Sequence, residues 1–594
     1  MANSGGKTIA EIFCREAKAA PDRLLWRARK GASELWTPVT LADAHREARW
    51  IYHGLSALGV GDGDVIALVL RPGTDRALWD LAALCAGAVS VLVDPGLPSE
   101  ELASLLERLN PKLQVSSAPL PEAPGRLHLR LDGGPSPSDP HLSPATFRRL
   151  ASEHALSDPQ GFERSAFSVP ETAPAITQIS LDDGDAEPRL ATLTHAALVR
   201  GLRAVGTALG TENRQDRAFF STLPFSASCA RVESLGAIAF GWSVTYATHP
   251  DRDDSLFAEL REARPTHRWA SPRVVERAYR MLRLQAGGDG NEQERRLHDW
   301  ALASGKKWLE AARGEGSAGW RLTAEAAIAR NVGMRSKASE LGGRLEALIT
   351  GGDPLADEAG DYLRIAGIPV REAYTLTEAF GPLTLSGDAD GMTVPRSGSL
   401  GKPLPGIALR ISESGEVEVS PAEGGTLSRG DLGELDEDGS LRVLGRKHEL
   451  LGLTGGRRVI SPRHLETLAR LDRWIQQVAL YRRDQHYLIA LITLEREEAI
   501  RFAREHDILF SSYSELLHHP RIQKRVQRAL DRLNRALPRG LGIRKFCLIP
   551  DEFRLESGEL TPQGTLRRAR VARKYASQLD ALYGTEGTYG AHYR

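Results

Sequence analysis

Ala347-Leu-Ile-Thr-Gly-Gly-Asp-Pro-Leu355 and Arg371-Glu-Ala-Tyr-Thr-Leu-Thr-Glu378 are the two runs that decide the fold. The apolar residues of the first run predict the end of a buried strand. Gly351 and Gly352 follow it, and residues without side chains let backbone approach a ligand closely. Gly367 to Val370 predicts the start of the next short strand. Because ligands bind at the carboxyl ends of strands in open α/β sheets, the two runs predict a ligand site.

The loop expected from Tyr374 to Glu378 carries three kinds of ligand-binding group. Tyr374 offers an aromatic face to a base, Thr377 a hydroxyl to a phosphate, and Glu378 a carboxylate to Mg²⁺. The same residues also suit an ordinary strand–loop–helix turn with capping Thr and Glu. On this run alone, a nucleotide site and a plain turn both remain open.

Composition restricts the class of protein. At 594 residues the chain is too long for one core, so we expect two or more domains. Lys+Arg and Asp+Glu both number 77, which gives no electrostatic reason to expect nucleic acid as a partner. The apolar runs are too short to span a bilayer, and no signal peptide is evident. The four cysteines lie far apart, which argues against structural zinc and a disulfide framework. We expect a cytoplasmic protein with at most peripheral membrane contact.

Helical and strand patterns alternate near the amino terminus. Ile9 to Ala57 predicts helix, strand and helix, the last of these over Leu41 to Leu55. A buried strand is expected over Val65 to Leu70, a helix over Leu78 to Ala86, and a strand over Ala88 to Val93. This β-α-β alternation predicts a layered α/β domain.

Later segments add a loop, two helices and two strands. Ser117 to Pro144 is rich in Pro, Gly and Asp and predicts a surface loop. Helices are expected over Pro272 to Leu284 and Arg295 to Ala312. Ile407 to Ile411 and Glu416 to Ser420 alternate as strands do.

Several runs resemble the adenylate-forming superfamily of acyl-CoA synthetases, luciferases and peptide-synthetase adenylation domains. Tyr374 to Glu378 is similar to its Tyr-Gly-x-Thr-Glu motif, and Gly351-Gly-Asp-Pro-Leu355 resembles the Gly-Gly-Ala-Pro-Leu of long-chain acyl-CoA synthetases. Gly398 to Gly406, Arg429-Gly-Asp-Leu-Gly433 and Gly445-Arg-Lys-His-Glu449 resemble later motifs, in family order. The second of these resembles the family's Thr-Gly-Asp, with Arg429 at the position of the Thr. The resemblance covers nearly the whole chain.

The resemblance implies an α/β fold with a large N-terminal domain of layered sheets and helices and a small mobile C-terminal α+β domain. The implied boundaries are 1–445 for the AMP-binding domain, 446–448 for the hinge, and 449–584 for the small domain. Residues 585–594 are expected to form a flexible tail. His448 lies where the family swings its small domain.

The resemblance also implies site residues. Asp431 would accept hydrogen bonds from the ribose hydroxyls, and Arg446 would contact the ribose. Glu378 would hold Mg²⁺, and Gly455 and Gly456 would frame the tunnel for the CoA thiol. The implied nucleotide-binding set is Gly351, Gly352, Tyr374, Thr377, Asp431 and Arg446, with Thr377, Glu378 and Arg446 as catalytic residues. Mg²⁺ and ATP, with CoA as co-substrate and a fatty acid or acyl ligand, would serve an active enzyme.

One departure from the family pattern lies in the phosphate loop. Leu193-Thr-His195 is preserved, and Arg189 stands where the family has Lys. The preceding run, however, carries Asp182, Asp183 and Asp185 in place of most of the small residues whose N–H groups face an anion. Each unpaired like-charge contact near 4 Å costs about 4 kcal/mol at an effective dielectric of ~20. We therefore expect a solvated acidic turn that no longer grips ATP; a turn that recruits a metal ion is the alternative.

A second departure lies near the carboxyl terminus, where Gly558 to Arg568 resembles the family's ending. Counting without gaps places Thr565 at the position of the family's Lys, which stabilises charge during adenylation. Loss of one such stabiliser costs roughly 10² to 10³ in rate. With two inserted residues, Arg567 would stand there instead, although guanidinium and ammonium are not interchangeable at a tight site. Ala227 is a third departure, where the family often has His.

These departures make a long-chain acyl-CoA synthetase-like protein with strongly impaired adenylation the favoured hypothesis. An active AMP-forming ligase with a long apolar tunnel remains an alternative. So do a pseudoenzyme that binds a fatty acyl ligand or a protein partner, and an enzyme that forms only the thioester from a supplied acyl-adenylate.

Overall fold

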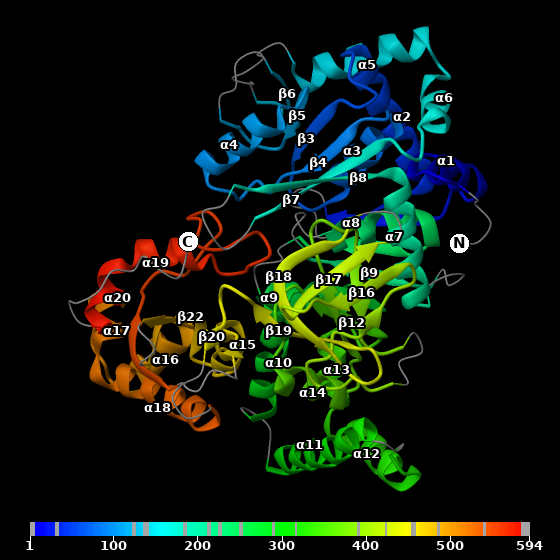
Figure 1. The fold of residues 1–594 in the computed structure, drawn as a ribbon. Helices are drawn as coiled ribbons and strands as arrows, with labels where there is room; N and C mark the ends of the chain where they lie inside the picture. Colours follow the sequence, from blue (N-terminus) through cyan, green and yellow to red (C-terminus); the bar gives the residue numbers. More distant parts are fainter. Residues whose placement is uncertain are drawn as a thin grey trace.

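The chain folds into a large N-terminal part and a smaller C-terminal part that lie side by side (Figure 1). The structure is a computed structural model. It describes residues 6–29, 35–121, 126–134, 142–181, 187–210, 216–223, 228–248, 253–287, 292–314, 318–388, 393–421, 425–452, 459–483, 487–537 and 542–583. The predicted fold class, a large α/β region followed by a small α+β region, is confirmed.

A six-stranded sheet occupies the first third of the chain, with strand order β6-β5-β3-β4-β7-β8. Its strands are β3 (Val65–Val69), β4 (Val89–Leu92), β5 (Leu113–Ser116), β6 (Leu127–Arg130), β7 (Pro174–Ser180) and β8 (Arg189–Thr194). Strands β3 to β7 pair in parallel, whereas β7 and β8 form an antiparallel hairpin. The helices here are α2 (Leu41–Ala57), α3 (Thr74–Cys85), α4 (Ser99–Leu109), α5 (Pro144–Ser157) and α6 (Gly161–Ser168).

The expected β-α-β order is present in this sheet, and two expectations about the early chain need correction. The surface loop predicted from Ser117 to Pro144 contains strand β6, whose Leu129 is buried. The single strand predicted between the first two helices is a hairpin of β1 (Leu24–Arg29) and β2 (Trp36–Thr40). Because β1 and β2 are both short, the apolar residues in them show little periodicity.

A nine-stranded sheet forms the centre of the large part, with strand order β15-β14-β13-β12-β11-β9-β10-β1-β2. Its further strands are β9 (Ala218–Ser221), β10 (Ser243–Tyr246), β11 (His267–Ala270), β12 (Ala347–Gly351), β13 (Val370–Thr375), β14 (Pro382–Leu385) and β15 (Lys402–Pro403). Strand β13 extends through Tyr374, so this residue lies on a strand and not in the loop as expected. Its ring is buried, and burial on a sheet favours an aromatic residue.

Helices cover the nine-stranded sheet. They are α1 (Ile9–Ala19), α7 (His195–Ala208), α8 (Ser228–Phe240), α9 (Asp253–Ala263), α10 (Pro272–Gly287) and α14 (Asp357–Ile365). Helices α11 (Glu292–Arg313) and α12 (Trp320–Gly333) project from the body, and α13 (Arg335–Glu340) returns the chain to it (Figure 1). The two predicted helices in this region correspond to α10 and α11.

Helix α8 carries two charged residues into the core. Arg231 donates to Asp80 of α3 through Nε at 2.9 Å and Nη2 at 2.7 Å, and both side chains are buried. Glu233 is 0% exposed on the same helix. Burial raises the pKa of Glu233 to about 8, so its carboxyl group is mostly protonated at neutral pH.

A four-stranded antiparallel sheet follows, made of β16 (Ile407–Ile411), β17 (Glu416–Pro421), β18 (Leu427–Leu435) and β19 (Leu441–Arg446). The alternation predicted for the first two strands is present, with Val417 and Val419 fully buried. This sheet connects the large part to residue 447, after which the chain enters the smaller part.

The smaller part has its own sheet and core. Strands β22 (Ile475–Arg483), β23 (Tyr487–Leu494) and β24 (Ile543–Leu548) form the sheet, and β20 (Leu451–Gly452) pairs with β21 (Val459–Ile460). Its helices are α15 (Pro462–Ala469), α16 (Arg496–Glu505), α17 (Tyr513–His518), α18 (Pro520–Ala536), α19 (Arg568–Lys574) and α20 (Ala576–Tyr583). Across the described ranges, no helix of either part has the length and apolarity needed to cross a bilayer.

Candidate functional site

The clearest polar group at the predicted site joins strands β13, β18 and β19. The Tyr374 hydroxyl donates to Oδ2 of Asp431 at 2.7 Å, and Arg446 Nε lies 3.6 Å from Oδ1 of the same carboxylate. Burial, followed by the charge of Asp431, raises the pKa of Tyr374, so the phenol remains a donor. Asp431 and Arg446 are direct partners in the β18–β19 ladder, which fixes their spacing. Three residues predicted from sequence are thus brought together.

Glu378 lies in the turn after β13, and its carboxylate has a cationic neighbour. Arg429 Nη2 lies 2.6 Å from Oε1 of Glu378, with side chains 9% and 15% exposed. Arg429 also donates to the hydroxyl of Ser180 at the end of β7. The second carboxylate oxygen, Oε2, is buried and accepts no hydrogen bond from any described residue. Arg429 therefore connects the six-stranded, nine-stranded and four-stranded sheets at one point.

Among the described residues, the surroundings of Glu378 are those of an ion pair and not of a divalent metal site. Its carboxylate is paired with a guanidinium, and the described residues contain no group of three or more His, Cys, Asp or Glu side chains able to hold a metal. A dication about 4 Å from a guanidinium would meet a repulsion of about 8 kcal/mol at an effective dielectric of ~20. Arg429 thus competes with the metal ion that Glu378 is predicted to bind, and the motif did not reveal this contact.

The phosphate-loop departure falls on a hairpin. Strands β7 and β8 pair from Pro174 opposite Thr194 to Ser180 opposite Arg189. Asp182, Asp183 and Asp185 lie outside the described residues, between the two strands. Arg189 is exposed and is the first residue of β8. Its backbone therefore belongs to a strand, at a position where the family has its phosphate loop.

The glycine pair and Thr377 lie close to this site. Gly351 ends β12, and a Cβ built on it would come within 2.3 Å of the Ala373 carbonyl oxygen. The neighbouring strand, and not only a ligand, therefore requires glycine here. Gly352 has a φ of +90°, which also favours glycine. Thr377 is half-buried beside Glu378 in the turn.

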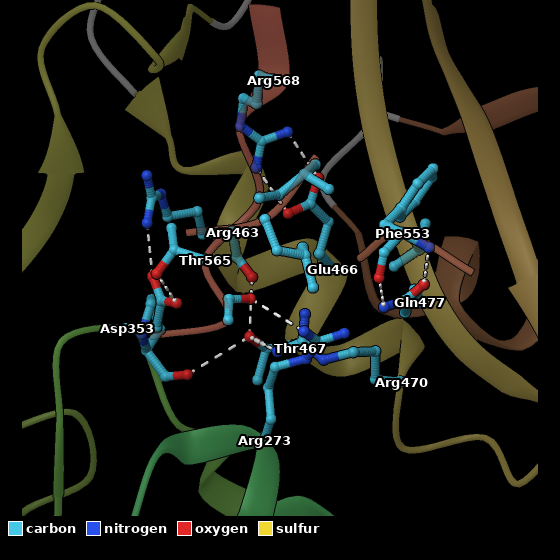
Figure 2. Close-up of a pocket in the computed structure, with 15 residues that line it drawn as sticks. Arg273, Asp353, Arg463, Glu466, Thr467, Arg470, Gln477, Phe553, Thr565 and Arg568 are labelled. Carbon is cyan, nitrogen blue, oxygen red and sulfur yellow. Dashed lines mark hydrogen bonds and ion pairs between the residues drawn. The ribbon is translucent and has the colours of Figure 1, made fainter. Parts of the chain in front are cut away.

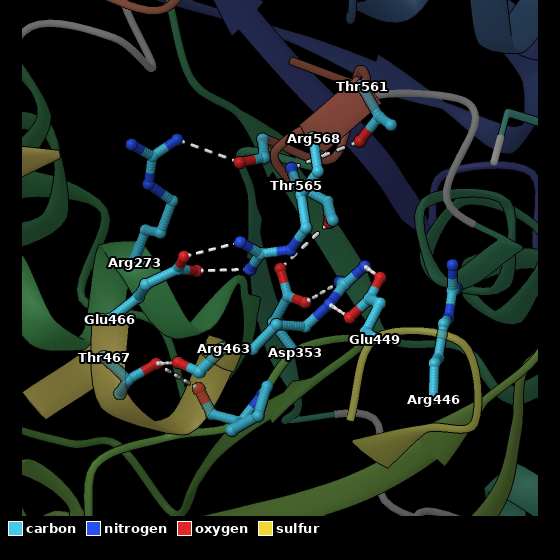
Figure 3. Close-up of polar contacts among 12 residues, drawn as sticks. Arg273, Asp353, Arg446, Glu449, Arg463, Glu466, Thr467, Thr561, Thr565 and Arg568 are labelled. Atoms are coloured by element: carbon cyan, nitrogen blue, oxygen red, sulfur yellow. Dashed lines mark hydrogen bonds and ion pairs between the residues drawn. The ribbon is translucent and has the colours of Figure 1, made fainter. Parts of the chain in front are cut away.

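Thr565, at the position expected for the family's Lys, hydrogen-bonds to the N-terminal part. Its hydroxyl donates to Oδ2 of Asp353 at 2.9 Å. Arg463 binds the other oxygen of Asp353 at 2.5 Å and both oxygens of Glu449 at 2.7 Å. Figure 3 shows these contacts in a row from Thr565 to Glu449, with Arg446 to one side. The Thr565 side chain is therefore held against the loop after β12 by its hydrogen bond to Asp353.

Arg567, the alternative to Thr565, is held elsewhere. Its Nη1 lies 2.9 and 2.8 Å from the two carboxylate oxygens of Glu101 on α4, and Arg570 pairs with the same carboxylate. The Arg567 side chain is 4% exposed. Arg567 and Arg570 thus share one carboxylate on α4.

A small polar cavity lies where the two parts meet (Figure 2). Its volume is about 40 Å³, enough for a few water molecules. Arg273 and Asp353 line it from the large part, and Glu466, Arg470 and Thr565 from the small part. Arg273 also donates to the Gly564 carbonyl oxygen at 2.9 Å. The cavity is too small and too polar for a fatty acyl chain.

Sequence reasoning missed several contacts of the site and could not place others. Arg429 and Asp353 were quoted within motifs but given no role, although each departs from the family residue at its position. Arg463 and Ser180 carried no signal. Gly455, Gly456 and Ala227 lie outside the described residues, and exposed His448 lies 3.8 Å from Glu449.

Comparisons with known proteins identify a family and several relatives of this chain. The family model described as "AMP-binding enzyme" matches residues 13–160 and 185–432. The chain is 30% identical over 605 aligned positions to the long-chain-fatty-acid–CoA ligase FadD15 of Mycobacterium bovis, covering 97% of each protein.

Two solved structures share the fold. The adenylation domain of a Mycobacterium chelonae carboxylate reductase has a TM-score of 0.68 and 18% identity, covering 98% of this chain and 92% of that one. The corresponding domain from Segniliparus rugosus, in complex with AMP and a co-purified carboxylic acid, has a TM-score of 0.66 and 15% identity, covering 98% and 95%.

Proposed function

The chain belongs to the AMP-binding enzymes of the adenylate-forming superfamily, and from this membership we propose a long-chain fatty acyl-CoA synthetase-like protein whose ATP-dependent adenylation is strongly impaired. The named activity of the M. bovis relative supports a long-chain fatty acid as the acyl group. The AMP bound by the S. rugosus domain supports a nucleotide at Tyr374, Asp431 and Arg446.

The position of Thr565 carries the proposed impairment. Adenylation in this family requires a cation that stabilises the negative charge as it moves between the carboxylate and the α-phosphate. Thr565 is neutral and bound to Asp353, and the alternative residue, Arg567, is bound to Glu101. A missing stabiliser of this kind lowers the rate by roughly 10² to 10³. The residues proposed to contact the nucleoside are present while the family's cation is missing, which favours binding of an adenylate over its synthesis.

The test is fatty-acid-dependent release of AMP from ATP with Mg²⁺ and CoA, across acyl chain lengths. We expect release by the unaltered protein to match a Glu378→Ala blank. Turnover well above that blank would mean that the protein is an active ligase and that the proposal is wrong. Acyl-adenylate supplied with CoA then tests the second candidate, thioester formation alone, which the retained nucleoside contacts favour.

A double variant, Asp353→Ala with Thr565→Lys, restores the residues that the family carries at both positions. We expect AMP release to rise by about tenfold or more, because an ammonium group is free to approach the nucleotide once its nearest carboxylate is removed. Thr323→Lys, on the exposed face of α12, is the matched control and should change nothing. An equal effect of both variants would show that added positive charge, and not its position, matters.

Asp431→Ala should weaken AMP binding by about tenfold or more, because a hydrogen bond to a charged group contributes about 1.5–3 kcal/mol. The change also leaves the buried Tyr374 hydroxyl without its acceptor. Calorimetric titration with AMP measures the loss. Tyr374→Phe is the matched variant: it keeps the carboxylate and should lose less affinity. Unchanged binding by Asp431→Ala would remove Asp431 from the nucleotide site.

A further inference from the structure

Arg429 occupies a specific place relative to the proposed ribose site. Arg429 and Asp431 are two residues apart on β18, and Gly430 between them has a φ of +73°, so their contacts, and not regular strand alternation, show where the two side chains lie. Asp431 binds Tyr374 of β13, and Arg429 binds Glu378 in the turn after β13. A nucleoside held by Asp431 would place its phosphate near the guanidinium.

We infer that the Arg429 guanidinium replaces the divalent cation at this site, so that the protein binds a nucleoside monophosphate, free or as an acyl-adenylate ester, without a metal ion. The inference rests on the proposed nucleotide site. It adds the class of ligand, a phosphate of low charge, and the residue that neutralises it.

The charges around Arg429 favour a monophosphate over a triphosphate. Glu378 and Arg429 together are neutral, so among the described residues this pair adds no net charge to the phosphate end of the site. A phosphodiester or mixed anhydride carries one negative charge, whereas a triphosphate carries about four. Guanidinium matches phosphate geometry through paired N–H donors, and it keeps its charge at any physiological pH. A neutral carboxylate–guanidinium pair gives little attraction to the magnesium complex of ATP.

The burial of Arg429 makes this cation a fixed part of the site. Its side chain is 9% exposed and donates to Ser180 as well as to Glu378. Moving it away would break contacts with two different sheets at once. A resident cation held in this way does not dissociate, unlike a metal ion that arrives with its nucleotide.

Two titrations of the full chain test the inference. The first measures AMP binding by calorimetry in EDTA and in Mg²⁺, where equal affinities are expected. The second follows free Mn²⁺ by electron paramagnetic resonance, where the unaltered protein should bind none at the site. Arg429→Thr, which carries the family residue, should lose AMP affinity in EDTA by about tenfold or more.

Two further variants complete the test. Arg410→Ala removes an exposed arginine from the same four-stranded sheet, where it pairs with Glu418 at 2.6 Å, and should alter neither titration. Glu378→Gln keeps Arg429 and removes its partner, so AMP should bind at least as tightly as to the unaltered protein. This variant serves if Arg429→Thr does not fold.

The inference fails if the unaltered protein binds Mn²⁺ at a site lost in Glu378→Gln, or if EDTA weakens AMP binding by about tenfold. It also fails if Arg429→Thr folds and binds AMP in EDTA as tightly as the unaltered protein does. These outcomes are independent of turnover. Fatty-acid-dependent AMP release would contradict impaired adenylation while the Mn²⁺ titration still decides the role of Arg429.

Discussion

Arg568→Ala is expected to lower the free energy of unfolding of the C-terminal part by about 3–5 kcal/mol. Arg568, the first residue of α19, donates to both oxygens of Glu466 on α15, at 2.7 and 2.6 Å. The two side chains are 2% and 4% exposed. Removing one partner leaves a buried, uncompensated carboxylate, which costs far more than the pair gained on forming. Because α19 follows the segment of Thr565, the docking of this segment depends on the pair.

Hydrogen exchange of strands β22 and β23 under native conditions reports the stability of this part separately from the rest of the chain. Arg501→Ala is the matched control: its partner Glu498 lies on the same exposed helix, and a surface pair contributes about 1 kcal/mol or less. The double change Arg568→Met and Glu466→Leu removes both charges and should cost less than Arg568→Ala. A single-variant loss no larger than that of the control would contradict the prediction.

Glu233→Gln is expected to remove a pH dependence of stability. Burial raises the pKa of Glu233 from 4.5 to about 8, although Ser221, the Trp269 backbone, Arg268 and Arg76 oppose the shift. Between these two pH values the folded chain keeps a proton that the unfolded chain releases. The contribution of Glu233 to the free energy of unfolding therefore falls as pH rises, by roughly 1.4 kcal/mol per pH unit, and levels off above pH 8.

Chemical unfolding between pH 5 and 8 checks this, because the raised pKa places the titration in that window. Glutamine cannot ionise, so the stability of the variant relative to the unaltered protein should increase steadily toward pH 8. Glu310→Gln, on the exposed surface of α11, is the control and should run parallel to the unaltered protein. Parallel curves for Glu233→Gln as well would show that Glu233 is ionised in the fold.

Much of the fold could be predicted from patterns within single segments. Ile407–Ile411 was placed to the residue because its alternation is regular. The strands expected after Asp64 and Gly87 were placed to within one residue at each end, because their apolar runs begin directly after turn residues. The strand of Tyr374 was cut short because an aromatic residue followed by Thr suits both a buried strand and a ligand loop. Strand β6 was hidden in a segment whose composition is that of a loop.

The candidate site could be predicted only in part, because several of its contacts join segments that lie far apart in the sequence. Tyr374, Asp431 and Arg446 were assigned to one site from the family resemblance, and the structure brings them into contact; their role in nucleotide binding stays a prediction. The partner of Glu378 was not found, because the contact of Arg429 depends on how three sheets meet, and no local pattern encodes that meeting. Thr565 was identified as a departure, but its acceptor, Asp353, belongs to the other part of the chain.

Ion pairs between described residues of the two parts run mostly in one direction. Three acidic side chains on the large part, Glu101, Glu276 and Asp353, pair with arginines of the small part. The reverse arrangement, Arg280 with Glu495, also occurs. If the small part moved away, Arg463 would keep Glu449 as a partner, whereas Asp353 would lose Arg463. Separating these ion pairs would therefore cost electrostatic energy. At 0.15 M salt, where screening acts over about 8 Å, the facing charges attract one another only when the two parts are closer than about that distance.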